Sequence, residues 1–538
     1  MDRAPSDARA TRAGQRALGW AAVVVPAVVA LALGLQRSLR LPLWRDEYAT
    51  ALFAQLPLGD LMSALAHVDA VTGPYYLLAH ATSPVLGHGT GLRALSLAAF
   101  ALTASVVALV ALRWWGPLAA ASAGLAFACN GAALTAAVQA RPYALAVLFV
   151  ALAVLTADLA ASTGRRRAWI AYAVAASAAV AMHVLALIAV LLTALLLVGR
   201  RRPPAGRAPA LAWWCGTTAP AVAVAVALLV PGLGQRGQLG WMSDPTFRSA
   251  LSDLARAAGV SPHREALFDG LALLALAAAL AVAILAASRP AEARRAAPAE
   301  PAATEIARIR PVVLAGSLAF VPWTLLLGAS WLVTPILAER YMTWSALGAA
   351  LVVAAAVHAA QTARRGLALG AGILAGVLFA GSVALAVERL WDLPPAADDF
   401  PAAVGVVERG AAPGDLLVLQ QRYYEGGVAY GFAESAADPE QLGDVFDRQP
   451  EGGQPPLDVR RITSTDPLRS SADAGAAGVG ETVWLVGLVQ PLDPGVDATL
   501  EPSLAACLAD ARSSEHDRFG ALYVYRIECA DAETTDSD

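Results

Sequence analysis

Long apolar runs separated by short arginine-rich segments make up about the first three quarters of the chain. A membrane-spanning helix needs about 20 mostly apolar residues. Runs of that length predict spans at about 17–36, 91–112, 117–138, 142–161, 211–231, 267–288, 311–333, 342–361 and 366–388. The run at 168–199 is too long for one span, because a helix rising 1.5 Å per residue would reach about 48 Å there, against a hydrocarbon core of about 30 Å. We therefore predict two short helices that turn near Met182-His183, and about 11 spans in all.

Arginine positions predict the orientation of these spans, since cytoplasmic loops are enriched in basic residues. Arg16 precedes the first run, and Arg165–Arg167 and Arg200–Arg202 flank the long one. We expect a cytoplasmic tail at 1–16 and a transmembrane domain at 17–388. Large external loops are expected at 37–90 and 232–266. The piece Pro74 to Leu86 is too short to span and is expected to be interfacial or re-entrant.

The last part of the chain, 389–538, changes pattern. Short apolar, β-rich runs predict buried strands, separated by helix-like or Pro/Gly-rich segments. They lie at Asp415–Gln420, Gly427–Phe432, Thr482–Val489 and Ala521–Glu528. We predict a soluble α/β domain on the extracytoplasmic side, because an odd number of spans separates it from the amino terminus. Cys507 and Cys529 could form a disulfide there.

Composition agrees with a multi-pass protein of the plasma membrane. Of the 538 residues, 57% are hydrophobic and 15% charged, and the mean hydropathy is +0.55. All 39 basic residues are arginine; residues 1–388 hold 29 of them against 16 acidic residues, and residues 389–538 hold 10 against 27. The arginines lie between apolar runs and not on a basic face with interleaved aromatics, so nucleic acid is not an expected partner.

Polar side chains gather in the predicted external segments, where they are the first candidates for chemistry. Asp46 and Glu47 follow the first span directly, and their carboxylates could act as a general base, bind a metal or simply solvate a loop. The same outer layer holds further candidates at His67, Asp69, Tyr75, Tyr76, His80, Tyr143, His183 and Tyr341.

Arg141 and Arg340 are each predicted at an outer helix end beside a tyrosine. Arginine is suited to bidentate capture of phosphate. The alternative for each is a pair with a carboxylate or a side chain that snorkels to the interface. Taken alone, His80 and His183 are more readily explained by hydrogen-bonded packing than by catalysis.

Three motifs make the chain resemble bacterial GT-C glycosyltransferases, in particular the protein O-mannosyltransferase and aminoarabinose-transferase group. They are Trp44-Arg-Asp-Glu47, the segment from Asp69 to His80, and Ala140-Arg-Pro-Tyr-Ala-Leu145. The resemblance covers roughly residues 15–390. It implies a GT-C-like helical membrane fold whose 389–538 tail matches only in position.

The resemblance implies an inverting transfer of a sugar from a polyprenyl-phosphate donor to an extracytoplasmic hydroxyl. It assigns the general base to Asp46, with Glu47 as its neighbour. Arg141 and Arg340, with Tyr143 and Tyr341, would hold the donor phosphate. The sugar or acceptor side would be lined by His67, Asp69, Tyr75, Tyr76, His80 and His183.

Donor sugar, acceptor and metal dependence stay open at this point. Mannose is suggested by the family, and other hexoses or pentoses are alternatives. Protein-glycosylating members often carry His-Pro-Pro in the first loop where this chain has Thr72-Gly-Pro74, which weakens a protein acceptor relative to lipid or polysaccharide. Asp46, Glu47 and Asp69 could supply oxygen ligands to Mg²⁺ or Mn²⁺, but we expect no obligatory metal.

Two other classes of function compete with the enzyme. A transporter of lipid-linked sugars would be expected to carry charges near the bilayer midplane, whereas the titratable groups here cluster in external loops. A catalytically inactive scaffold of cell-envelope assembly would leave the Trp44–Glu47 and Ala140–Leu145 motifs without a role.

Overall fold

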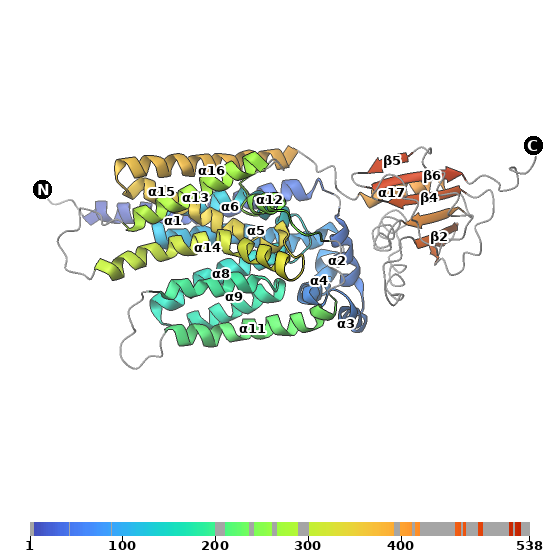
Figure 1. The fold of residues 1–538 in the computed structure, drawn as a ribbon, viewed down its shortest axis with the longest axis horizontal. Coiled ribbons are helices and arrows are strands. Elements are labelled where there is room, and N and C mark those ends of the chain that lie inside the picture. The colour runs from blue at the N-terminus through green and yellow to red at the C-terminus, as the bar shows by residue number, and fades with distance from the viewer. Residues whose placement is uncertain are drawn as a thin grey trace, which may run out of the picture. The chain divides into compact units, whose positions relative to one another are not determined.

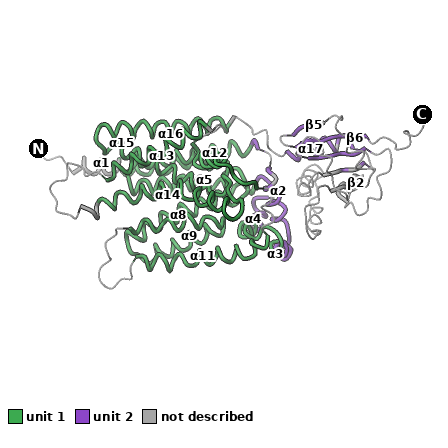
Figure 2. Tube along the Cα trace, in the orientation of Figure 1, with its two compact units in different colours: residues 1–39, 65–78, 91–392 green, residues 40–64, 79–90, 393–538 purple. Residues whose placement is uncertain are grey.

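The computed structural model describes residues 5–41, 43–87, 89–198, 210–235, 242–260, 266–288, 301–391, 399–411, 415–419, 458–463, 466–469, 482–487, 516–519 and 522–528. These residues fall into two compact units, coloured separately in Figure 2. Unit 1 comprises 1–39, 65–78 and 91–392, and unit 2 comprises 40–64, 79–90 and 393–538. The first predicted external loop is thus divided between the units.

Unit 1 is a bundle of long helices (Figure 1). Its principal helices are α1 (Pro5–Ser38), α5 (Arg93–Trp115), α6 (Pro117–Ala128), α7 (Gly131–Ala137), α8 (Tyr143–Thr163), α9 (Arg166–Met182), α10 (Ala186–Leu192), α11 (Ala210–Gly234), α12 (Phe247–Ala257), α13 (Ala266–Ser288), α14 (Pro301–Leu332), α15 (Ser345–Thr362) and α16 (Arg365–Trp391). Short 3-10 helices add η1 (Ala70–Thr72), η2 (Thr90–Leu92), η3 (Thr193–Leu197) and η6 (Glu339–Met342).

Eight of the described helices are long and apolar enough to cross a membrane, and the count becomes nine if the bent pair α6–α7 forms one span. The other two of the 11 predicted spans correspond to α9, with 17 residues, and to the short apolar segment Ala186–Leu197. The predicted break between them is confirmed, since α9 ends at Met182 and His183 has an extended backbone at φ −154° and ψ 113°. The chain is a polytopic helical membrane protein.

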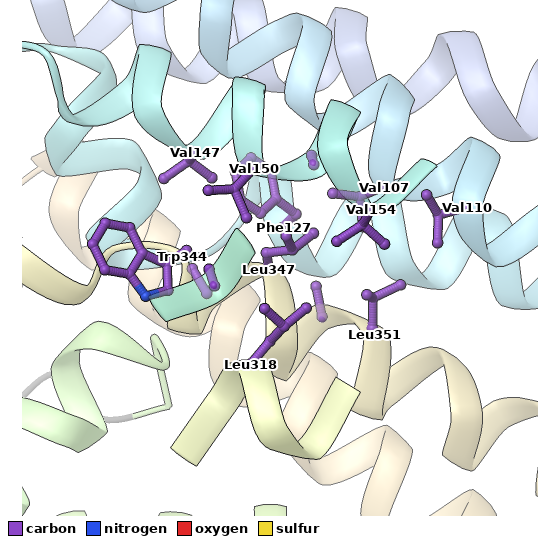
Figure 3. Packing of buried hydrophobic residues seen from close by; sticks show 14 of the residues in the cluster. Val107, Val110, Phe127, Val147, Val150, Val154, Leu318, Trp344, Leu347 and Leu351 are labelled. Carbon is purple, nitrogen blue, oxygen red and sulfur yellow. The ribbon is translucent and has the colours of Figure 1, made fainter. Parts of the chain in front are cut away.

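The core of the bundle is built by small and β-branched residues that let helices approach closely. Val107, Val150, Val154 and Leu347 are buried in one cluster, together with the fully buried ring of Trp344 (Figure 3). Helix α15 is buried along most of its length, and it packs against α6, α13, α14 and α16. It therefore occupies the centre of the bundle.

The outer helices present large apolar side chains outward. Trp20 of α1, Leu274 of α13 and Leu369 of α16 are each 66–71% exposed. Apolar surface on this scale suits a lipid environment, where it carries no cost.

The first predicted external loop is largely helical. It contains α2 (Arg45–Gln55), α3 (Leu58–His67) and α4 (Gly73–Leu86), and the division between the units falls within α3 and again within α4. Helix α4, with 14 residues, is not among the candidate spans, as expected for Pro74 to Leu86. In the loop predicted at 232–266 the structure adds α12, whose first turn is capped by Thr246 Oγ1 accepting from Ser249 N at 3.1 Å.

The C-terminal part of unit 2 holds α17 (Phe400–Gly410) and one mixed sheet. The strands are β1 (Leu416–Leu419), β2 (Asp458–Thr463), β3 (Asp466–Arg469), β4 (Thr482–Gly487), β5 (His516–Phe519) and β6 (Leu522–Glu528). They lie in the order β3-β2-β1-β4-β6-β5, with β1 and β4 parallel and the other pairs antiparallel. The predicted α/β domain is confirmed. The expected strand at Gly427–Phe432 and the pair Cys507 and Cys529 lie outside the described residues.

Candidate functional site

A buried chain of hydrogen bonds in unit 1 links three of the predicted site residues. The Tyr76 hydroxyl donates to Asp69 Oδ2 at 2.8 Å, and Arg141 Nη1 donates to the same hydroxyl at 2.9 Å. The Arg141 guanidinium carbon also lies 5.7 Å from the centre of the Tyr76 ring. Arg141 is 7% exposed and Tyr76 is fully buried. A segment that is distant in the sequence thus holds Arg141 through both the hydroxyl and the ring of Tyr76.

Tyr76 is neutral in this arrangement. Burial raises the pKa of the Tyr76 phenol well above its ordinary value, and the Asp69 carboxylate acts in the same direction, while Arg141 opposes it. A phenol that keeps its proton can donate to Asp69 and accept from Arg141 at the same time. The tyrosine therefore joins the carboxylate to the guanidinium.

Asp69 occupies a turn whose two sides are hydrogen-bonded to the side chain of Gln235. Its φ of 53° lies in the left-handed region, which costs energy for a non-glycine residue and is found at functional sites. Gln235, at the end of α11, accepts from Ala70 N at 2.9 Å and donates to Leu65 O at 3.2 Å. Its amide thus clamps both sides of the Asp69 turn. Gln235 belongs to no recognisable motif, and only its place at the start of the 232–266 loop could have drawn attention to it.

A second cluster of predicted residues surrounds His183, in the extended link between α9 and α10. The rings of Tyr143, Tyr341 and Trp344 lie 5.9, 5.5 and 5.5 Å from the His183 ring, measured between centroids. Arg340 lies over the Tyr341 ring, with its guanidinium carbon 5.5 Å from the centroid. Three separate parts of the chain therefore meet at this histidine.

His183 connects the two predicted phosphate-binding arginines. Burial, together with the positive charges of Arg141 and Arg340, lowers the pKa of His183 from 6.5 to about 4. Both arginines are therefore electrostatic neighbours of one neutral imidazole. The buried Nδ1 atom of His183 and the buried Nε1 atom of Trp344 have no hydrogen-bond partner among the described residues. Buried polar atoms of this kind call for a partner, and two arginines beside them make an anionic ligand the natural one.

Arg340 is supported from α12, which the sequence analysis did not predict. Arg256 of α12 donates from Nε to Glu339 Oε2 at 3.0 Å and also contacts Asp253. The segment before Glu339 is tied down by Ser330 Oγ, which accepts from Ile336 N and Leu337 N at 3.0 and 2.9 Å. Glu339 thus serves to anchor the turn that carries Arg340.

The two predicted catalytic carboxylates lie in the first turn of α2, in unit 2. Glu47 is 1% exposed, and its Oε2 accepts from Trp44 N at 2.9 Å. This is the reach-back of a third-position glutamate that caps a helix amino terminus. Asp46 is half-buried and lies in the same turn, where the helix dipole stabilises negative charge. The structure therefore gives Glu47 a capping contact, and it leaves Asp46 as the carboxylate with access to solvent.

Helix α2 shares one hydrophobic core with the C-terminal domain. Leu43 and Tyr48 are buried in a cluster with Phe400 and Val404 of α17 and Trp484 of β4. The tail is therefore attached to the segment that carries Asp46. The pattern of apolar positions could not reveal this contact, because its partners are far apart in the sequence.

The remaining candidates are dispersed. His80 Nδ1 lies 3.1 Å from Ala54 O, a contact within unit 2 that ties α4 to α2. Tyr75 is fully buried, with its ring 6.5 Å from that of Tyr76, and His67 is exposed at the end of α3. Among the residues that the structure describes, no group of three or more His, Cys, Asp or Glu side chains could hold a metal ion.

Comparison with solved structures finds two kinds of similar protein. ArnT from Cupriavidus metallidurans bound to undecaprenyl phosphate is 17% identical, with a TM-score of 0.40, over 94% of this chain and 98% of that one. The Archaeoglobus fulgidus oligosaccharyltransferase AglB, in complex with an inhibitory peptide and a dolichol-phosphate, is 11% identical, with a TM-score of 0.44, over 81% and 61%. The apo oligosaccharyltransferase from the same organism is 12% identical, with a TM-score of 0.42, over 73% and 58%.

These neighbours are GT-C glycosyltransferases, the group that the sequence motifs resemble. The chain spans less than two thirds of the length of the oligosaccharyltransferases. No protein-family model matches the sequence, and no curated protein matches it.

Proposed function

We propose that the protein is an integral-membrane glycosyltransferase that moves a sugar from a polyprenyl-phosphate donor to a hydroxyl group on the extracytoplasmic side of the membrane. The observation that carries this proposal is that Arg141 and Arg340 are both charged neighbours of the half-buried, neutral His183, whose ring lies against those of Tyr143 and Tyr341. Two guanidinium groups beside the buried Trp344 Nε1 donor, which has no hydrogen-bond partner among the described residues, would form a site for a phosphate.

The phosphate site accounts for the leaving group. When a sugar leaves a polyprenyl-phosphate sugar, the bond between the anomeric carbon and the phosphate oxygen breaks, and its electron pair stays on that oxygen. A phosphodiester with one negative charge becomes a phosphate monoester with two. Arg141 and Arg340 would stabilise the second charge as it develops, and preorganised cations of this kind commonly supply a large part of catalysis.

The fixed position of Arg141 supports this role. Its side chain is held by Tyr76, which is itself held by Asp69, so the guanidinium needs little reorganisation when charge develops. Asp69, Tyr75, Tyr76 and His67 would face the sugar or acceptor, as the family resemblance implies. His80 would act through its contact with Ala54, which steadies α2.

Asp46 would act as the general base. Its carboxylate would take the proton from the acceptor hydroxyl as the acceptor oxygen bonds to the anomeric carbon, on the face opposite the departing phosphate. The configuration at that carbon would be inverted. A positioned base of this kind contributes roughly 10²–10⁴-fold to the rate. Glu47 would support Asp46 by capping α2. The sugar would be mannose or another hexose or pentose, and the acceptor a lipid, polysaccharide or protein hydroxyl.

The phosphate site can be tested by binding alone. Purified full-length protein is titrated with undecaprenyl phosphate, and bound lipid is counted by native mass spectrometry. We expect Arg141→Gln and Arg340→Gln each to weaken binding by about tenfold or more, since each removes a charge-assisted contact. Arg141→Lys keeps the charge and should weaken binding less.

Arg165→Gln is the matched control, because Arg165 is exposed beyond the other end of α8 and should bind lipid as wild type does. Equal binding by wild type and both glutamine variants would contradict the phosphate site. Absence of binding to wild type would favour the scaffold hypothesis.

A further inference from the structure

A second pair of arginines lies at the C-terminal end of α1, in unit 1. Arg37, in the last turn of α1, is 8% exposed. Its Nε atom is buried without a hydrogen-bond partner, and no ion pair joins Arg37 to an acidic side chain among the described residues. Its charged neighbour is Arg389, in the last turn of α16. Two like charges are thus brought together in a largely buried place.

Arg389 is firmly positioned by α7. Its Nη1 donates to Gly131 O at 2.9 Å and contacts the Thr135 hydroxyl. A Cβ atom at residue 131 would lie 2.9 Å from Arg389 Nε and 3.0 Å from its guanidinium carbon. Only glycine leaves room for the guanidinium to lie against this turn of α7. Arg389 therefore cannot easily swing away from Arg37, because α1, α7 and α16 pack against one another.

Attraction to the end of α1 does not account for Arg37. Cations are favoured near helix C-termini, where carbonyl groups lack partners. Here Arg93 Nη1 donates a hydrogen bond to the Ser38 carbonyl oxygen at 3.1 Å, and Leu39 N donates to the Leu35 carbonyl oxygen at 3.1 Å. Arg37 makes no hydrogen bond to a carbonyl among the described residues. Glu388 adjoins Arg389 in sequence, yet it forms no ion pair with Arg37.

A buried cation beside a second cation is costly unless an anion compensates both. Arginine binds phosphate through a planar fork that matches its oxygens, and a pair of arginines can hold one phosphate from two sides. The ends of α1 and α16 lie at the membrane surface that the arginine pattern predicts to be the outer one. Phosphate groups are available there both on lipids and in solution.

We propose that Arg37 and Arg389 bind a phosphate group, supplied by an anionic lipid headgroup or by free phosphate. This site shares no residue with the cluster around Arg141 and Arg340, and the proposal does not depend on the proposed transferase activity. A bound anion would contact both Arg37 on α1 and Arg389 on α16, and would thereby join the first and last long helices of unit 1. Without the anion, the two arginines repel each other across that junction.

The test measures the melting temperature of the full-length protein in detergent. Phosphatidylglycerol is titrated in one arm, inorganic phosphate in a second, and diacylglycerol, which has no phosphate, in a third. We expect a stabilising shift in the wild type with a phosphate-bearing additive and none with diacylglycerol. A shift only with phosphatidylglycerol identifies a lipid headgroup, and an equal shift with inorganic phosphate identifies the free anion.

Arg37→Gln is the decisive variant, because Arg37 makes no hydrogen bond or ion pair with the described residues whose loss would unfold the protein. In additive-free detergent it should melt at or above the wild-type temperature, since one of two repelling charges is gone. The concentration of phosphate-bearing additive needed to raise its melting temperature should be at least about tenfold higher than for the wild type. Arg37→Lys should respond in between, and Arg16→Gln, exposed near the other end of α1, should respond as wild type does. An Arg37→Gln response equal to that of the wild type, or no response of the wild type to either phosphate source, would overturn the proposal.

Discussion

The ring of Tyr48 meets the ring of Phe400 edge-on, with centroids 5.1 Å apart and planes at 87°. Tyr48 belongs to α2, two residues after Asp46, and Phe400 is the first residue of α17 in the C-terminal domain. Both rings are at most 1% exposed. The C-terminal domain therefore helps to fix the helix that carries the proposed base, which gives the tail a positioning role.

Replacing Tyr48 by alanine should separate transfer from donor binding. Truncating a buried aromatic ring costs about 3–5 kcal/mol of stability in a packed core, and it would loosen α2 on the C-terminal domain. Small displacements of a catalytic group can lower the rate by about 10²-fold. We expect sugar transfer to fall by this order while binding of undecaprenyl phosphate stays unchanged, because Arg141 and Arg340 belong to unit 1. Tyr48→Phe keeps the ring and should keep the activity, and a loss of donor binding in Tyr48→Ala would argue against a local effect.

Removing the Tyr76 hydroxyl should weaken donor binding. Tyr76→Phe leaves the ring in place but breaks the link from Asp69 to Arg141, and hydrogen bonds to charged groups contribute about 1.5–3 kcal/mol each. The expected result is a rise of about tenfold or more in the Kd for undecaprenyl phosphate. Tyr75→Phe is the matched control on the neighbouring ring. Because burial raises the pKa of Tyr76, wild-type donor binding should show no loss from tyrosine ionisation between pH 7 and 10.

His183 should make the fold sensitive to acid. Burial and two arginines lower its pKa to about 4 in the folded protein, from 6.5 in the unfolded chain. Between these values the unfolded chain binds the extra proton, so the stability contributed by neutral His183 is present above pH 6.5 and is lost as pH falls toward 4. The melting temperature of the wild type should therefore fall between pH 7 and 5, and by more than that of His183→Gln. An equal fall in both proteins would show that other groups cause the acid sensitivity.

Helix positions in unit 1 could be predicted because lipid imposes one simple pattern. A long apolar helix satisfies all its backbone hydrogen bonds within a bilayer, so runs such as 142–161 correspond closely to α8. The break at Met182-His183 followed from the length of the run and from the arginines at both of its ends. Arg141, Tyr143, His183, Arg340 and Tyr341 were singled out because polar groups beside apolar runs are costly, and the structure brings them together around His183.

The contacts that position these residues could not be predicted from local patterns. Gln235 holds the Asp69 turn and Arg256 holds Glu339, each from a segment that was expected to be a loop. Helices α2 and α12 are short, and their ends are set by side-chain caps from Glu47 and Thr246. Such hydrogen bonds are directional and depend on the folded backbone. The pattern of polar and apolar residues therefore does not predict these hydrogen bonds.

The most direct test compares the wild type with Asp46→Asn, using purified full-length protein, a panel of radiolabelled polyprenyl-phosphate sugars, and membrane or wall extracts as acceptors. We predict that the wild type transfers one sugar of the panel, and that Asp46→Asn binds the same donor while transferring it at least about 10²-fold more slowly, the loss expected for a general base. Glu47→Gln is the matched control; it keeps an oxygen to cap α2 and should lose far less. Equal transfer by the wild type and Asp46→Asn would contradict the assignment of the base, and no donor binding by either protein would contradict the transferase itself.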